Sequence, residues 1–197
     1  PASNPVIISN NAVYNFRGGI VYGIYVSTGP NTLIYHNTVD LSMPTGSSSA
    51  NYGLYLTGTN TGTLVKNNNV SITDGTTGTT YGFYYNTAAS ITDAQKNNFY
   101  VNSSTAATQY YGYYAAAYPT QAAFQAAHPT REVGSPAEDP WYLDPLNGDF
   151  TPLAINLGTG EDLSLAVPVD INGFSRPSQP TIGAFENTIQ KASNDLG

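Results

Sequence analysis

Cysteine is absent from this chain of 197 residues, and methionine and tryptophan each occur once. Without cysteine the protein cannot depend on disulfides, which fits an exported protein that gains its stability from stacked repeats. Charged residues are also scarce, at 10%, and only six of them are Lys or Arg, so the formal net charge is −7. Because no cluster of basic residues exists, we exclude nucleic acid and anionic lipid as partners.

Long apolar segments are missing as well. No run is long enough to span a membrane, and no signal peptide is visible, so we expect no direct membrane insertion. The chain opens on strand-like residues, Pro5 to Ile8. A first coil without a polar cap would expose its apolar end, so we interpret the chain as a piece of a longer solenoid that can also self-associate end to end.

The most informative feature present is a repeated Tyr-Gly phrase. Its four glycines lie 30, 29 and 30 residues apart, and a fixed period of this length indicates a stacked repeat. The four copies are Tyr22–Tyr25, Tyr52–Tyr55, Tyr81–Tyr84 and Tyr111–Tyr114. A second phrase, which begins with asparagine, keeps the same register. Its asparagines are Asn11, Asn37, Asn68 and Asn97.

Each repeat reads as strand, turn, strand, turn. The runs of Val, Ile, Leu, Tyr and Thr are too short for helices, and clusters of Gly, Asn, Ser and Thr separate them. A unit of this length without a helix predicts coils whose strands stack in parallel. We therefore predict an all-β fold, a right-handed parallel β-helix of about four coils over residues 1–118.

Strand alternation assigns the faces of the Tyr-Gly phrase. The apolar residue directly after each glycine should point inward, and so should the residue two positions further along the strand. The inward columns are Ile24, Leu54, Phe83 and Tyr113, and then Val26, Leu56 and Tyr85. A ladder of phenol rings should then line the outer wall, sharing that face with the four glycines. This candidate binding ladder is Tyr25, Tyr55, Tyr84 and Tyr114.

The asparagines Asn11, Asn37, Asn68 and Asn97 are predicted to form a structural ladder at the bend between two strands. Asparagine tolerates the left-handed conformation, and stacked amides satisfy each other's donors and acceptors. Apolar residues flank this bend on both sides and should face the core. They are Ile8, Ile34, Val65 and Ala94 before it, and Val13, Val39, Val70 and Phe99 after it.

The repeats stop after Tyr118. Alanine and glutamine between Pro119 and Pro129 predict one short helix. The turn-rich residues that follow, with isolated apolar anchors, are typical of a cap. We predict a C-terminal cap over residues 119–187 and a linker over residues 188–197.

The end of the cap carries specific motifs: Asp144-Pro145, Gly148–Phe150, Ala154–Gly158, Asp170 to Arg176 and Ile182–Glu186. Together with the helix they resemble the C-terminal part of bacterial right-handed parallel β-helix surface proteins, of the choice-of-anchor type common in Bacteroidota. The resemblance covers most of residues 119–187 and implies a secreted or cell-surface protein whose anchor or sorting domain would follow the linker. Within this motif, Asp170, Arg176 and Glu186 are interpreted as structural ion pairs.

No catalytic constellation is visible. The acids of the repeats, Asp40, Asp74 and Asp93, occupy different positions in their coils, whereas a glycosidase needs two carboxylates at one groove. The two histidines, His36 and His128, lie far apart and do not suggest a metal site. We therefore predict no catalytic residues, no metal and no cofactor.

These observations favour a non-enzymatic extracellular module with a structural or adhesive role. The predicted tyrosine ladder would contact a polysaccharide or a cell-surface protein. Two alternatives stay open: the C-terminal fragment of a secreted polysaccharide lyase or glycoside hydrolase, and a subunit of a self-assembling fibre. Stacked and covered rings with a purely structural role are a further interpretation of the ladder.

Overall fold

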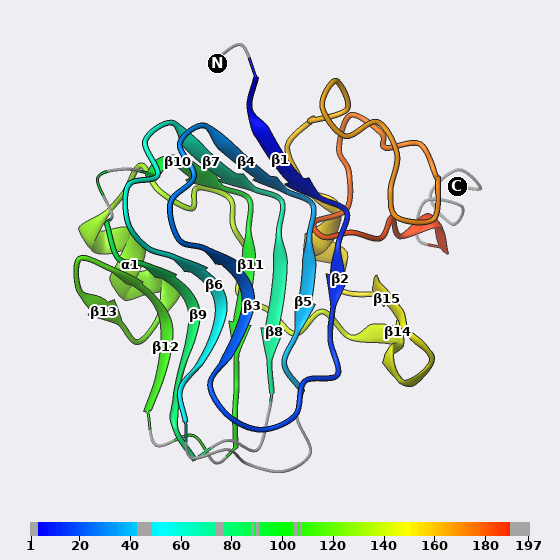
Figure 1. The fold of residues 1–197 in the computed structure, drawn as a ribbon. Helices are drawn as coiled ribbons and strands as arrows, with labels where there is room; N and C mark the ends of the chain where they lie inside the picture. Colours follow the sequence, from blue (N-terminus) through cyan, green and yellow to red (C-terminus); the bar gives the residue numbers. More distant parts are fainter. Residues whose placement is uncertain are drawn as a thin grey trace.

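The computed structural model describes residues 4–42, 49–73, 77–87, 89, 91–104, 106 and 108–189. Three parallel sheets, each with one strand from every repeat, make up its first two thirds (Figure 1). The first sheet contains β1 (Val6–Ser9), β4 (Thr32–Tyr35), β7 (Thr63–Lys66) and β10 (Ile91–Gln95). The second contains β2 (Ala12–Val13), β5 (Thr38–Asp40), β8 (Asn69–Ile72) and β11 (Asn98–Val101). The third contains β3 (Val21–Val26), β6 (Asn51–Leu56), β9 (Thr79–Tyr85) and β12 (Thr108–Tyr114).

This topology confirms the predicted parallel β-helix. In the three sheets of the coil, the strands of successive repeats pair in parallel, as in the register of Ile8 with Ile34 and of Ile34 with Val65. The strands stack in four rungs, and the chain makes about three turns between the first rung and the last. The residues between Tyr-Gly phrases therefore fold as one coil each.

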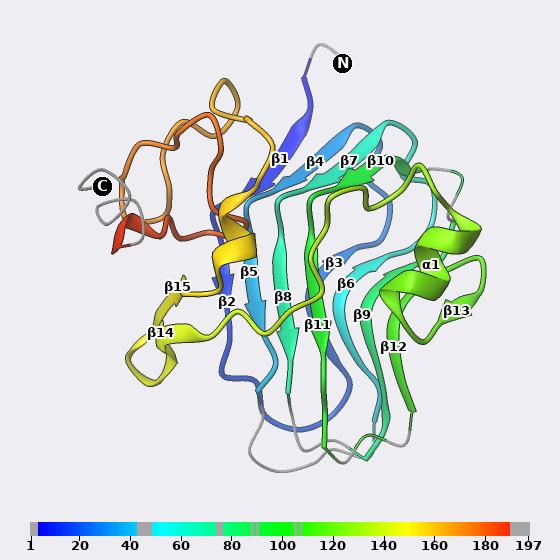
Figure 2. The same ribbon diagram turned by 180° about the vertical axis from the view of Figure 1, so that it is seen from behind.

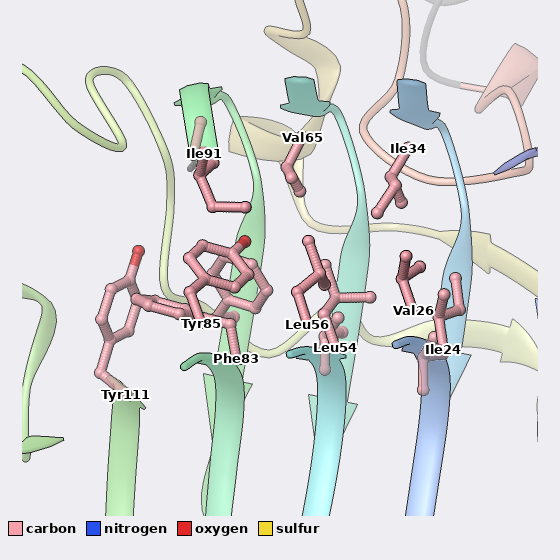
Figure 3. Close-up of a cluster of buried hydrophobic side chains, with 14 of the residues drawn as sticks. Ile24, Val26, Ile34, Leu54, Leu56, Val65, Phe83, Tyr85, Ile91 and Tyr111 are labelled. Carbon is pink, nitrogen blue, oxygen red and sulfur yellow. The ribbon is translucent and has the colours of Figure 1, made fainter. Parts of the chain in front are cut away.

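The core lies inside the coil. Side chains of the first sheet, such as Ile34 and Val65, point toward Leu54 and Leu56 of the third sheet (Figure 3). The predicted inward columns after the asparagines are confirmed too, because Val39, Val70 and Phe99 are almost fully buried. Each rung thus adds one layer of apolar side chains to a continuous core, which is the main source of stability for stacked repeats.

The bend between the first and second sheets has two residues per rung. The residue before each predicted ladder asparagine adopts the left-handed backbone conformation. These residues are Asn10 (φ 54°), His36 (φ 52°), Asn67 (φ 56°) and Lys96 (φ 57°). The expectation that the ladder asparagines themselves adopt this conformation was wrong. The first bend residue makes the turn, which leaves the next one free to direct its amide along the axis.

Helix α1 (Gln121–Ala127) closes the fourth rung, in agreement with the helix predicted between two prolines. Thr120 caps it, because its Oγ1 accepts a hydrogen bond from the amide of Ala123 at 3.2 Å. Its buried Phe124 packs against Phe83, with ring centroids 5.3 Å apart. A short strand, β13 (Ala117–Tyr118), pairs antiparallel with β12 on the same side.

Residues 138–187, here called the return segment, do not cap that end. They run back along the bend from the fourth rung to the first, as the yellow to red part of Figure 2 shows. Glu138 binds Asn98, the amide of Gly183 donates to Asn67, and Asn10 donates to the carbonyl of Val169. Only residues 119–137 therefore act as the predicted end cap, and residues 190–197 of the predicted linker lie outside the described part.

Four short elements lie in the return segment. They are β14 (Tyr142–Asp144), η2 (Pro145–Asn147), β15 (Asp149–Pro152) and η3 (Ile155–Gly158). β14 and β15 form an antiparallel pair, and Phe150 of β15 contacts the ring of Tyr14 at 4.6 Å. This contact ties the hairpin to the first rung. Among the described residues, no helix has the length and apolar character needed to cross a membrane.

Candidate binding surface

The outer face of the third sheet carries two columns of tyrosines. Tyr22 and Tyr25 are three positions apart, yet their rings stack at 5.3 Å, so both lie on the same face. The same arrangement recurs in the other rungs. We call these eight residues the tyrosine wall: Tyr22, Tyr52, Tyr81 and Tyr110 in one column, and Tyr25, Tyr55, Tyr84 and Tyr113 in the other.

Each column is a stack along the axis of the coil. In the first column, Tyr52 lies 5.2 Å from Tyr22 and 5.3 Å from Tyr81, with interplanar angles of 8° and 3°. In the second, Tyr84 lies 5.0 Å from Tyr55 and 4.2 Å from Tyr113. Rings of the two columns meet edge to face, which is a favoured aromatic geometry. Neighbours cover much of each ring face, so the wall presents ring edges and phenol hydroxyls.

The glycines of the Tyr-Gly phrases make this arrangement possible. They face the core, however, and not the outer wall as predicted. A Cβ added to Gly53 would lie 2.3 Å from Cγ1 of the buried Val70 and 2.4 Å from the carbonyl oxygen of Gly82. Gly23 meets Val39 in the same way. The glycines therefore point inward, where the third sheet closely approaches the second. Glycine and the next residue both face the core, so strict alternation fails and the two flanking tyrosines share the outside.

The fourth rung corrects two predicted faces: Tyr113, expected to point inward, lies on the wall, and Tyr114, expected on the ladder, does not. In the pairing of β12 with β9, Gly112 lies opposite Phe83 and Tyr113 lies opposite Tyr84. Tyr114 pairs instead with Tyr85, and its ring contacts His128 of the cap at 4.7 Å. Tyr113 thus takes the place predicted for Tyr114, because the ring of Phe83 occupies the space that a side chain at position 112 would need.

The tyrosine wall is electrically neutral. The strands β3, β6, β9 and β12 contain no charged residue. Burial, reinforced by the neighbouring phenols, raises the pKa of Tyr52 to about 12. Burial also raises the pKa of Tyr55, Tyr81 and Tyr84. The hydroxyls of these four tyrosines therefore stay protonated under physiological conditions and can both donate and accept hydrogen bonds.

Sequence reasoning missed five of the eight tyrosines of the wall: the whole first column, and Tyr113 of the second. The first column, Tyr22 to Tyr110, has the same period as the predicted ladder, but strict alternation assigns it to the opposite face. The one available signal was the glycine inside each Tyr-Gly-x-Tyr phrase, which can mark a local break in the pleat. The rings are half-buried by each other, and Tyr25, at the end of its column, is 54% exposed.

The amide ladder at the bend is present as predicted. The Nδ2 of each asparagine donates to Oδ1 of the next one, at 2.8 Å from Asn11 to Asn37 and 2.9 Å from Asn37 to Asn68 and from Asn68 to Asn97. The same Oδ1 atoms accept from the backbone amide of the preceding rung's asparagine. Because these amides satisfy each other inside the protein, they form part of the structure and offer no free group to a ligand.

Glu132 ends this ladder at the fourth rung. Both of its carboxylate oxygens accept from Nδ2 of Asn97, at 3.1 and 3.0 Å, and Ser135 donates to Oε2 at 2.6 Å. Burial raises the pKa of Glu132 to about 7, although these hydrogen bonds act in the opposite direction. The cap thus supplies the acceptor that a further asparagine would provide.

The predicted ion-pair residues hold the return segment against the first rungs. Arg176 forms a buried ion pair with Glu186 at 2.6 Å, and it also donates to Oδ1 of Asn10 at 2.7 Å. Asp170 instead accepts backbone amides, including that of Glu186 at 2.9 Å. His36 is buried beside this network. Burial, with a contribution from Arg176, lowers its pKa to about 3, so the imidazole is neutral.

The acids considered for catalysis do not converge among the described residues. Asp93 forms an ion pair with Lys66 at 3.0 Å on the first sheet, whereas Asp40 lies on the second sheet and accepts from Ser42. Asp74 lies outside the described part of the chain. The described residues also contain no group of three His, Cys, Asp or Glu side chains that could hold a metal ion.

Comparison with family models, curated proteins and solved structures finds no match. The fold and its surface therefore carry the functional argument, and the resemblance to surface proteins of Bacteroidota stays a prediction.

Proposed function

We propose that this chain is a non-enzymatic extracellular module that adheres to glycans through the tyrosine wall. One observation carries the proposal: eight neutral tyrosines repeat in register along one face of a rigid coil. Aromatic residues that are held in place by stacking lose little conformational entropy when they bind. The low charged fraction and the lack of cysteine are in keeping with an exported solenoid.

The spacing of the wall favours a polymer over a small ligand. Rings in one column follow each other at 4.2 to 5.3 Å, and one pyranose unit of an extended glycan chain has a similar length. Phenol hydroxyls at this interval can exchange hydrogen bonds with successive sugar units. Because the exposed groups are hydroxyls and ring edges, we infer that hydrogen bonding contributes more than stacking on sugar faces.

The test is binding of the chain to an array of bacterial, plant and algal polysaccharides, with reaction products assayed for cleavage. Tyr55→Ala and Tyr84→Ala remove rings, whereas Tyr55→Phe and Tyr84→Phe remove only hydroxyls. Tyr100→Ala on β11 of the second sheet is the matched control, since that residue lies outside the wall. We expect the wall variants to lose binding and the control to keep it. Equal binding by all variants would refute the proposal, and cleavage would support the enzymatic alternative.

A further inference from the structure

The only tryptophan of the chain, Trp141, lies in the return segment and not on the tyrosine wall. It directly precedes β14 in the chain, and 68% of it is exposed to solvent. Its backbone adopts the left-handed conformation, with φ at 47°, which is unfavourable for a bulky residue. A strained backbone that displays an apolar ring is a reason to look for a function at that position.

Hydrogen bonds fix the backbone that carries the indole. The amide of Trp141 donates to Oδ1 of Asp139 at 3.0 Å. The carbonyl of Pro140 accepts from the amides of Leu153 and Ala154, at 3.0 and 3.3 Å. These contacts fix the backbone on both sides of the ring, so the indole is presented from a defined position, as a binding platform requires.

A cavity of about 390 Å³ lies beside the indole. Its apolar lining comes from Trp141 and from Leu153, Ala154 and Ile155, and its polar lining comes from Glu138 and Asp139. Ile155 is 73% exposed, so an apolar side chain faces solvent here in addition to the indole. This combination of an apolar platform with a few polar groups is typical of small-ligand sites.

The two acids have unused capacity for hydrogen bonds. Oε2 of Glu138 accepts from Nδ2 of Asn156 at 2.8 Å, whereas Oε1 is shielded from solvent and has no partner among the described residues. Asp139 uses Oδ1 for the amide of Trp141. Ionised carboxylates only accept hydrogen bonds, so the free carboxylate oxygens call for a ligand that donates through hydroxyl groups.

We propose that Trp141, Glu138 and Asp139 form a second binding site, which takes one or two units of a neutral saccharide. The C–H face of a sugar ring would lie on the indole, and its hydroxyls would donate to the carboxylate of Asp139 and, after a change of side-chain rotamer, to Oε1 of Glu138. No Lys or Arg lines the cavity, and the chain as a whole has a net charge of −7, so acidic sugars are disfavoured. The site is independent of the tyrosine wall, because different elements build it.

Tryptophan fluorescence provides a direct test, since every change in indole emission reports on position 141. The intact chain is titrated with cellohexaose and mannohexaose as neutral probes and with oligogalacturonate as the acidic probe. We expect a saturable change in emission with at least one neutral probe and none with the acidic probe. No change with either neutral probe, or a response to the acidic probe alone, overturns the proposal.

Variants separate this site from the wall and from effects on folding. Glu138→Gln and Asp139→Asn keep the size of the side chains, and we expect each to weaken neutral-sugar binding about tenfold, because one acceptor is lost. Trp141→Phe should weaken it similarly in calorimetry. Tyr55→Phe should leave the emission change intact even if the wall itself binds nothing. Unchanged affinity in all three site variants, with unchanged thermal unfolding, overturns the proposal.

Discussion

Two ladders of identical residues run along the same solenoid, and they differ in how their polar groups are satisfied. The asparagines at the bend are buried from the second rung onward, and each amide both donates and accepts along the axis. The tyrosines of the third sheet touch through their rings and are only partly buried. Periodicity therefore does not reveal the role of a column. Burial with saturated hydrogen bonds indicates a structural role, whereas partial exposure leaves a column accessible to a ligand, which is why we propose binding for the tyrosines.

The largest loss of stability is expected when an asparagine is removed from the middle of the asparagine ladder. Asn68→Ala deletes a side chain that donates to Asn97 and to the carbonyl of Ile34, and that accepts from Asn37. We expect the free energy of unfolding to fall by about 4 kcal/mol, because each buried group left unpaired costs roughly 1–3 kcal/mol. Urea denaturation measures this loss. Asn11→Ala, at the partly exposed end, should cost much less; equal losses would argue against a cooperative buried ladder.

Titration of Glu132 tests the terminus of the same ladder. Its pKa is raised from 4.5 to about 7 by burial, so the folded state binds a proton more tightly than the unfolded state does. This contribution to stability is therefore full below pH 4.5 and is lost as the pH rises to about 7, by roughly 3 kcal/mol. The measurement is the free energy of unfolding between pH 4 and pH 8, a range that covers both values.

Glu132→Gln is the matched variant, because glutamine keeps an acceptor for Asn97 but does not titrate. His36 has the opposite dependence: its pKa falls from 6.5 to about 3, so its stabilisation is lost as the pH drops through that window. Subtracting the profile of the variant from that of the parent protein isolates Glu132. Parallel profiles for the two proteins would show that the carboxyl does not titrate in this range.

The close approach of two sheets behind the tyrosine wall is tested by Gly53→Ala. The new Cβ would meet Val70 and the carbonyl oxygen of Gly82, so we expect a loss of about 2 kcal/mol in thermal or urea unfolding. Gly158→Ala is the control, because no atom lies within 4 Å of the added Cβ there. Its stability should change by less than about 0.5 kcal/mol. A tolerated alanine at position 53 would mean that the glycine serves the outer face after all.

Substitutions in the tyrosine wall are expected to have the smallest effect on the free energy of unfolding. Tyr55→Ala removes ring contacts with Tyr52 and Tyr84, at 4.8 and 5.0 Å, and should cost about 1 kcal/mol. Tyr55→Phe should leave thermal unfolding unchanged while it weakens glycan binding. This separation of binding from stability would sharpen the contrast with the asparagines. A large loss of stability in Tyr55→Phe would instead give the hydroxyls a structural role.

The sequence by itself determined the repeat, the strands, the inward apolar columns apart from Tyr113, and the asparagine ladder. These features follow from local patterns that recur in register, about every 30 residues, and each repeat meets the same environment. Only the tertiary structure decided that the first tyrosine column and Tyr113 also face outward, because the second sheet approaches so closely that glycine must turn inward. The path of the return segment and the Trp141 cavity likewise depend on contacts between residues far apart in the chain. These contacts do not repeat, so they leave no periodic pattern in the sequence.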